Sequence, residues 1–207
     1  MLKTLAKLAT AAAITAALIT PALASTDTTK LLRDANRTVT NMRHDPAFSQ
    51  ARKMIDQARA IYIVPKLIKG GFIFGAEGGD GVLLERTKHG WSDPRFYGMG
   101  SVSYGLQAGL EKAELVFIIN SDRALRGIKA GNFKVGGNGG ITVATLSAGA
   151  EAATTLHGGD MVVWTSATGA YGGLTLNGSV IKPDKDENAA YRTSPEAEVL
   201  RKNLDSL

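Results

Sequence analysis

Hydrophobic residues recur three and four positions apart between residues 27 and 60, as they do along one face of an amphipathic helix. One such face, within residues 27–43, holds Leu31, Leu32, Ala35, Val39 and Met42. Asp45 and Pro46 then form a break that suits a helix cap and a first helical residue. A second stripe follows, made of Phe48, Ala51, Ile55, Ala58 and Tyr62. The pattern predicts two consecutive helices.

After residue 61 the pattern changes to short β-prone runs, and all 24 glycines lie between Gly70 and Gly178. Glycine permits positive φ and close backbone approach, so this spacing predicts tight turns and crowded strands. The run 115–119 is continuously apolar and is expected to be a central strand. The other strands are expected at about 71–77, 81–87, 98–109, 132–136, 140–147, 160–167, 170–176 and 178–182. Ser121 is expected to cap a short helix over residues 122–128, and Ser194 a C-terminal helix.

These elements predict an α+β fold, in which a glycine-rich antiparallel β core is flanked by N-terminal amphipathic helices and a short C-terminal helix. Residues 25–207 are expected to form one domain, because their number suits a single core. Within this domain the expected parts are helices over 25–60, the β core over 61–183, and a polar tail and helix over 184–207. The chain has no cysteine, so disulfides cannot stabilise it.

The first 24 residues have the organisation of a cleaved secretory signal. Lys3 and Lys7 supply a positive start, residues 8–19 are apolar, and Ala22-Leu23-Ala24 is a small-residue cleavage motif. An apolar run of this length is shorter than the roughly 20 residues that a spanning helix needs. The sequence therefore predicts export with Ser25 as the mature N-terminus. A bacterial periplasmic location is expected, with secretion as the alternative.

The positive charge of the expected mature chain is concentrated near its N-terminus. Removing Lys3 and Lys7 lowers the net charge from +5 to +3. Residues 25–60 contain seven basic and four acidic residues, whereas residues 61–207 contain 15 of each. Basic amphipathic helices suit an anionic membrane surface. The alternative is that their apolar stripes pack on the β core while their charges meet water.

A second basic cluster is expected around the short helix at residues 122–128. It consists of Arg123, Arg126, Lys129 and Lys134. Three of these residues are about one helical turn apart and could hold a phosphate together. The alternative is an ordinary solvated helix face.

The sequence offers little for catalysis or for metal binding. It has no Gly-Lys dipeptide and therefore no phosphate-binding P-loop. The segment 101–105 resembles a nucleophile elbow but lacks its first glycine. The acidic segment 184–188 resembles the start of a calcium loop, but Ala189 stands where glycine is required. We expect no enzyme activity, no catalytic residue, no metal and no cofactor. A modest charge in an exported protein also argues against nucleic acid as a partner.

Six segments carry a resemblance to a known family: 60–66, 69–75, 79–83, 91–94, 105–109 and 115–120. They include Lys69-Gly70-Gly71-Phe72-Ile73-Phe74-Gly75 and Trp91-Ser92-Asp93-Pro94. With the glycine-rich run 136–140 and Tyr171-Gly172-Gly173, their order and spacing resemble the SYLF family over roughly 150 residues. The resemblance implies a non-enzymatic lipid-binding domain. Eukaryotic relatives bind phosphoinositides through basic residues and an N-terminal amphipathic helix, and some fungal relatives bind actin.

The expected ligand is the headgroup of an anionic phospholipid at a membrane surface in the cell envelope. Lys66 and Lys69 match basic positions of the family motif, and backbone N–H groups at Gly70 and Gly71 could join them around a phosphate. The cluster from Arg123 to Lys134 is expected to contribute further headgroup contacts. Diffuse attraction is expected from Lys30, Arg33, Arg37, Arg52, Lys53 and Arg59. The alternative function is an envelope scaffold that binds a protein partner and no lipid.

Overall fold

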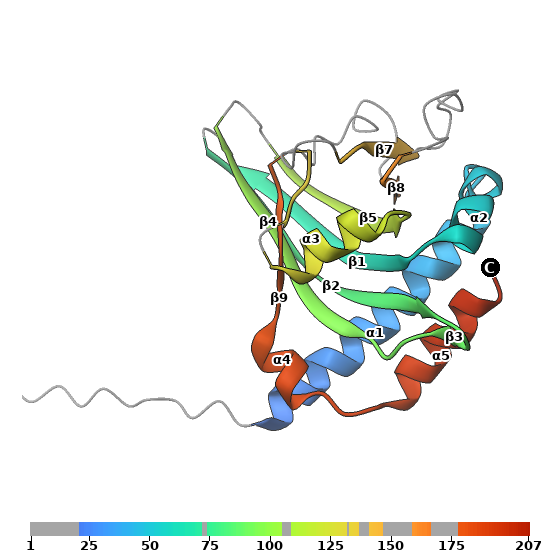
Figure 1. The fold of residues 1–207 in the computed structure, drawn as a ribbon. Helices are drawn as coiled ribbons and strands as arrows, with labels where there is room; N and C mark the ends of the chain where they lie inside the picture. Colours follow the sequence, from blue (N-terminus) through green and yellow to red (C-terminus); the bar gives the residue numbers. More distant parts are fainter. Residues whose placement is uncertain are drawn as a thin grey trace, which may run out of the picture.

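The computed structural model describes residues 21–71, 74–104, 109–131, 133–136, 141–146, 159–166 and 178–207. Helices α1 and α2 come first, and a curled sheet follows (Figure 1). The helices are α1 (Pro21–His44), α2 (Phe48–Gln57), α3 (Asp122–Lys129), α4 (Lys185–Ala190) and α5 (Pro195–Asp205). The strands are β1 (Ala60–Gly71), β2 (Phe74–Thr87), β3 (Gly90–Trp91), β4 (Arg95–Tyr104), β5 (Gly109–Ile119), β6 (Phe133–Lys134), β7 (Val143–Leu146), β8 (Met161–Thr165) and β9 (Val180–Pro183).

The described strands form one sheet in the order β6-β9-β4-β2-β1-β5-β8-β7, with β3 added beside β2. The predicted α+β class is confirmed, and β5 lies in the middle of the sheet as expected for its apolar run. The pairs are antiparallel except for β7 and β8, which are parallel. The expectation of an antiparallel core was therefore wrong at this edge, where residues 147–160 stand between the two strands in the sequence. Parallel neighbours need a connection of this length, because a two-residue hairpin joins only antiparallel strands.

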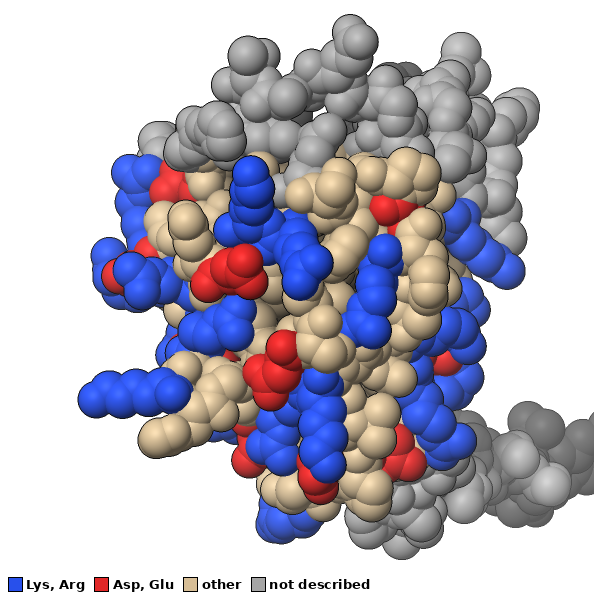
Figure 2. All heavy atoms as spheres, turned by 90° about the vertical axis from the view of Figure 1, so that its right-hand side faces the viewer, with Lys and Arg blue, Asp and Glu red and all other residues tan. Residues whose placement is uncertain are grey.

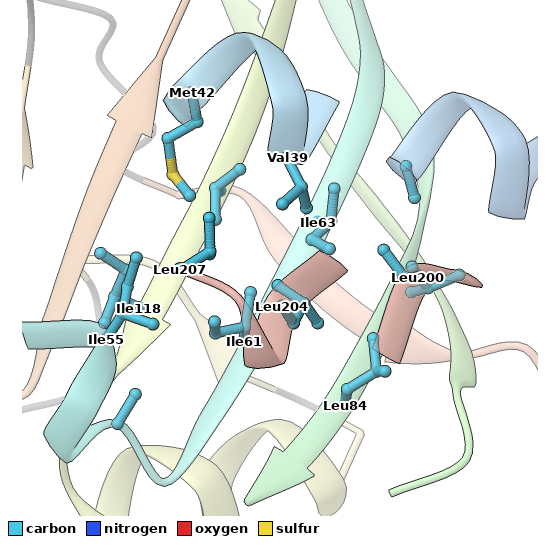
Figure 3. Close-up of a cluster of buried hydrophobic side chains, with 14 of the residues drawn as sticks. Val39, Met42, Ile55, Ile61, Ile63, Leu84, Ile118, Leu200, Leu204 and Leu207 are labelled. Atoms are coloured by element: carbon cyan, nitrogen blue, oxygen red, sulfur yellow. The ribbon is translucent and has the colours of Figure 1, made fainter. Parts of the chain in front are cut away.

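Helices α1, α2 and α5 cover one face of the sheet (Figure 3). The predicted stripe of α1 is buried there: Leu32, Ala35, Val39 and Met42 are all 0% exposed. Ile55 of α2 and Leu200 and Leu204 of α5 complete this layer against the sheet residues. The apolar stripes of both N-terminal helices therefore pack on the β core. Tyr62 was wrongly assigned to the second stripe, because it lies in β1 and belongs to the cluster on the opposite face. None of the helices among the described residues is long and apolar enough to cross a membrane.

The opposite face of the sheet holds a second apolar cluster. Tyr62 and Phe117 lie at its centre with ring centroids 5.6 Å apart. Ala124 and Ile128 of α3 are fully buried against this face. The helix begins as predicted, because the Ser121 side chain accepts a hydrogen bond from the backbone N–H of Ala124. Ser194 caps α5 in the same way at Ala197.

Several expected strand boundaries were wrong because glycine pairs were interpreted as separators. Residues 60–71 and 74–87 form two long strands: Gly78-Gly79 lies inside β2, whereas Gly70-Gly71 ends β1. A Cβ on Gly79 would lie 2.5 Å from the carbonyl oxygen of Lys66, where a bulge brings β1 close to β2. Glycine thus permits a crowded strand at this position. The expected strand at 170–176 lies outside the described residues.

The expected polar tail after residue 183 contains a short helix, α4. Asp184 is its cap and accepts hydrogen bonds from the backbone N–H groups of Asp186 and Glu187. The segment that resembled the start of a calcium loop therefore serves as a helix N-terminus. Aspartate is one of the preferred N-cap residues, because its carboxylate accepts hydrogen bonds from the first backbone N–H groups of the helix. This role of Asp184 explains the geometry without a metal ion.

Candidate functional site

The cations of α2 are exposed and form no ion pair with the residues that the structure describes. Arg52 and Lys53 are exposed, whereas Ala51 and Ile55 on the other side of the helix are buried. Neither cation lies within ion-pair distance of a carboxylate in the part of the chain that the structure describes. We call this pair the α2 surface. Figure 2 shows the side of the molecule on which α2, α5 and β3 lie, and Lys and Arg are more prominent on it than Asp and Glu.

Three cations of α1, namely Lys30, Arg33 and Arg37, are matched by carboxylates instead. Asp34 lies 2.5 Å from Lys30 Nζ and 2.9 Å from Arg37 Nη2. Arg33 faces Glu196 of α5 at 3.8 Å. Burial alone would raise the pKa of Asp34, but the hydrogen bonds and charges of Lys30 and Arg37 lower this pKa overall. The predicted contributors Arg33 and Arg37 are therefore exposed cations with compensated charge.

The predicted cluster on α3 is divided between paired and unpaired cations. Arg123 Nη2 lies 2.9 Å from Asp160, and Lys129 Nζ lies 2.8 Å from Glu85. Arg126 and Lys134 are exposed and reach no carboxylate among the described residues. The four cations therefore do not act as one unengaged phosphate site.

Asp160 is a carboxylate near α3 that several hydrogen bonds hold in place. It accepts hydrogen bonds from the Ser121 hydroxyl, from the backbone N–H of Thr142 at 3.0 Å and from Arg123. Together these contacts lower the pKa of Asp160 to about 2, with the Ser121 hydrogen bond as the largest cause. Arg123 thus has a structural partner that joins α3 to the start of β8.

Sheet pairing brings a further cation beside Lys134. Lys134 is the register partner of Val180, and Lys182 is two residues further along β9. Both lysines are exposed, while Phe133 and Ile181 between them are buried. Residues at such diagonal positions on one face are about 7–8 Å apart. Lys182 could not be predicted from the sequence, because only the pairing of β6 with β9 brings it close to Lys134.

Lys66 lies within the bulge of β1, and Lys69 follows it. Lys66 is exposed at the edge of a pocket, whereas the side chain of Lys69 lies outside the described residues. The backbone of Gly70 pairs with Ala76 of β2 and with Leu110 of β5. A strand between two neighbours directs its N–H groups into the ladders on either side. The glycine pair therefore does not provide the open backbone nest that was predicted around a phosphate.

The pocket at Lys66 has a volume of about 570 Å³ and lies between α1, α4 and the sheet. Its walls contain five carboxylates and two lysines: Asp27, Asp34, Asp80, Asp184, Glu187, Lys30 and Lys66. The remaining lining residues are Thr28, Leu31, Pro65, Ile68, Gly78, Gly79, Phe96 and Tyr97. A phosphate that reached Lys66 from inside this pocket would therefore face an excess of negative charge.

One carboxylate of the pocket is paired with cations, and the other four form no ion pair with a described residue. Asp34 binds Lys30 and Arg37, as described above. The other four, Asp27, Asp80, Asp184 and Glu187, form no ion pair with a described residue. Glu187 accepts a hydrogen bond from the Thr28 hydroxyl, which joins α4 to α1. No three His, Cys, Asp or Glu side chains among the described residues converge as metal ligands. This pocket could not be predicted from the sequence, because its residues come from distant segments.

Comparison with known proteins identifies the family. Residues 100–206 match the Ysc84 family, described as "Las17-binding protein actin regulator". The chain belongs to this family. The resemblance to SYLF proteins is thereby confirmed, since Ysc84 and SYLF denote the same domain. No solved structure matches the chain at a significant level.

The curated relatives are longer proteins. SH3 domain-containing YSC84-like protein 1 of Bos taurus is 33% identical over 141 residues, which cover 67% of this chain and 41% of that protein. The Homo sapiens protein of the same name is 32% identical over the same shares. Protein YSC84 of Saccharomyces cerevisiae is 29% identical over 143 residues, with 67% and 30% covered. The chain thus spans between about a third and two fifths of these relatives.

Proposed function

We propose that this chain is a non-enzymatic module that binds anionic phospholipid headgroups at a membrane surface, through the α2 surface. The observation that carries the proposal is the contrast in charge matching. Arg52 and Lys53 are exposed and form no ion pair with a described residue, whereas Lys30, Arg33 and Arg37 of α1 are paired. An unpaired cation can approach a phosphate without first giving up a carboxylate. The location that we propose is the periplasmic side of the cell envelope, on the ground of the secretory signal predicted over residues 1–24.

The binding mode that we propose is peripheral and electrostatic. Ala51 and Ile55 of α2 are 0% and 2% exposed, and the stripe of α1 is equally buried. Inserting either helix into the acyl region would require these side chains to leave the core. Basic residues near an anionic surface contribute about 1 kcal/mol each without insertion. Exposed Arg126, Lys134 and Lys182 would add attraction on another part of the surface.

Charge reversal on α2 tests this proposal. The variant R52E/K53E should bind phosphatidylglycerol vesicles at least about tenfold more weakly, because two attractive charges become repulsive. The matched control R33E/R37E makes the same change of four charge units on α1 and should retain most of the binding. Co-sedimentation at several salt concentrations measures both, and circular dichroism checks the fold. Equal losses in both variants would show diffuse attraction without a preferred face, and full binding by R52E/K53E would refute the α2 surface.

The alternative is a module that binds a protein partner in the cell envelope. The names of the family and of the yeast relative LAS seventeen-binding protein 3 favour it, because they record protein binding by those proteins. This alternative would be supported if the parent protein does not bind anionic vesicles at low salt and one stoichiometric partner co-purifies with it from envelope extracts.

A further inference from the structure

The pocket between α1, α4 and the sheet differs in chemistry from the α2 surface. From its geometry we infer that it is a binding site for a small organic cation with an alkylammonium group. This inference does not depend on anionic lipid binding, because none of the α2 cations lines the pocket. The carboxylates that would contact the ammonium group are Asp27, Asp80, Asp184 and Glu187.

The volume and the apolar lining of the pocket support a ligand site. The volume of about 570 Å³ lies within the usual range of small-molecule pockets, about 300–1,000 Å³. Leu31, Phe96 and Tyr97 supply apolar wall, which suits the methylene groups of an alkyl chain. Gly78 leaves part of the sheet wall without a side chain. A Cβ at Gly78 would meet only the carbonyl oxygen of Met99, at 3.7 Å, so the backbone there has room for a larger residue.

The charges of the lining select the class of ligand. Four carboxylates of the lining form no ion pair with a described residue, and they share the pocket with Lys66, which also has none among these residues. An opposite charge within about 4–6 Å favours an ionised group, so an ammonium ion is stabilised in this pocket and an isolated phosphate is not. The described carboxylates do not converge as metal ligands. Dispersed carboxylates around apolar wall fit an extended organic cation better than a compact metal ion.

Two sources can present the same alkylammonium group to the carboxylates of the pocket. One is a free aliphatic diamine, and the other is the ethanolamine headgroup of a phospholipid. Lys66 distinguishes them, because it repels a second ammonium group and attracts the phosphate of phosphoethanolamine. The substitution K66A should therefore strengthen the binding of 1,4-diaminobutane and weaken the binding of O-phosphoethanolamine.

The direct test is titration of the whole chain with these two compounds at low salt, followed by NMR chemical shifts. The variant D27N/D80N should weaken diamine binding roughly fivefold or more, because two charges leave the wall. The control D56N/D205N removes two exposed carboxylates outside the pocket and should change the affinity less than twofold. The variant G78L should abolish binding of both compounds, since its side chain occupies the pocket.

Vesicles separate the two sources. If the ligand is a lipid headgroup, phosphatidylethanolamine in a phosphatidylcholine background should recruit the parent, and G78L should lose this recruitment. If the ligand is a free amine, vesicles without anionic lipid recruit neither protein. Thermal melting checks that G78L is folded, and its binding to anionic vesicles reports the α2 surface separately. The inference is overturned if the parent shifts with neither compound, if D56N/D205N weakens binding as much as D27N/D80N, or if folded G78L binds as the parent does.

Discussion

Helices α1 and α2 are consecutive, amphipathic and basic, yet their charges meet different surroundings. The cations of α1 face Asp34 within the helix and Glu196 on α5. Those of α2 face solvent without a partner among the described carboxylates. A surplus of basic residues in a segment is therefore not enough to identify a binding surface. A basic segment is available for binding only where neighbouring elements do not supply carboxylates. This depends on tertiary contacts, which the sequence of the segment alone does not show.

The largest effects are expected in the cores that hold both helices. Replacing Leu32 of α1 by alanine should lower the free energy of unfolding by about 2–5 kcal/mol, because a fully buried leucine leaves a cavity. Ile55→Ala in α2 should fall in the same range. Val199 is 51% exposed, so Val199→Ala should cost less than about 0.5 kcal/mol. Urea denaturation measures all three. A small loss for Ile55→Ala would show that α2 is held only weakly on the sheet.

The buried face of each helix was predictable from the sequence, and the charge matching was not. The spacing of Leu32, Val39 and Met42 predicted the packed side of α1, since a helical period places them together. Ser121 and Ser194 predicted two helix starts through a local capping rule. By contrast, Arg123 and Asp160 are 37 residues apart, and Lys129 and Glu85 are 44 apart. Only the completed fold brings these pairs together.

Strand boundaries were less predictable for a physical reason. Glycine serves both at turns and where backbones approach closely, and the two uses look alike in a sequence. Gly79 belongs to the second use, because a side chain there would meet the carbonyl oxygen of Lys66. The pocket was equally hidden, since Asp27, Asp80 and Glu187 come from three separate segments. Asp184 was noticed as part of an acidic run, but its partners across the pocket could not be inferred.

An intermediate effect is expected at Asp160, which matches Arg123 as Asp34 matches the cations of α1. The folded pKa of about 2 lies below the ordinary 3.8. Asp160 therefore contributes stability that is present above about pH 4 and is lost as the pH falls toward 2. The contribution should be about 1–2 kcal/mol. In urea denaturation, the difference in stability between the parent and Asp160→Asn should shrink from pH 5 to pH 2. A difference that stays constant over this range would contradict the assigned contacts.

The smallest effects give the sharpest comparison of the two helices. Asp56 is the exposed acidic residue of α2 and forms no ion pair with a described residue, whereas Asp34 binds two cations of α1. Asp56→Asn and Asp34→Asn change the net charge by the same amount. If α2 faces the membrane, Asp56→Asn should raise the affinity for phosphatidylglycerol vesicles roughly threefold to fivefold, because it removes a repulsive charge beside Arg52 and Lys53. Asp34→Asn should change it less than twofold, although Lys30 and Arg37 are freed.

Stability separates this result from a folding effect. Exposed ion pairs contribute about 0–1 kcal/mol, so Asp34→Asn should cost no more than about 1 kcal/mol and Asp56→Asn still less. Vesicle co-sedimentation across a range of salt then compares two folded proteins of equal net charge. If the two variants gain affinity equally, net charge alone governs the attraction and the α2 surface has no special role. If only Asp56→Asn gains, the position of the charge matters, because attraction to the membrane falls off within a Debye length of its surface.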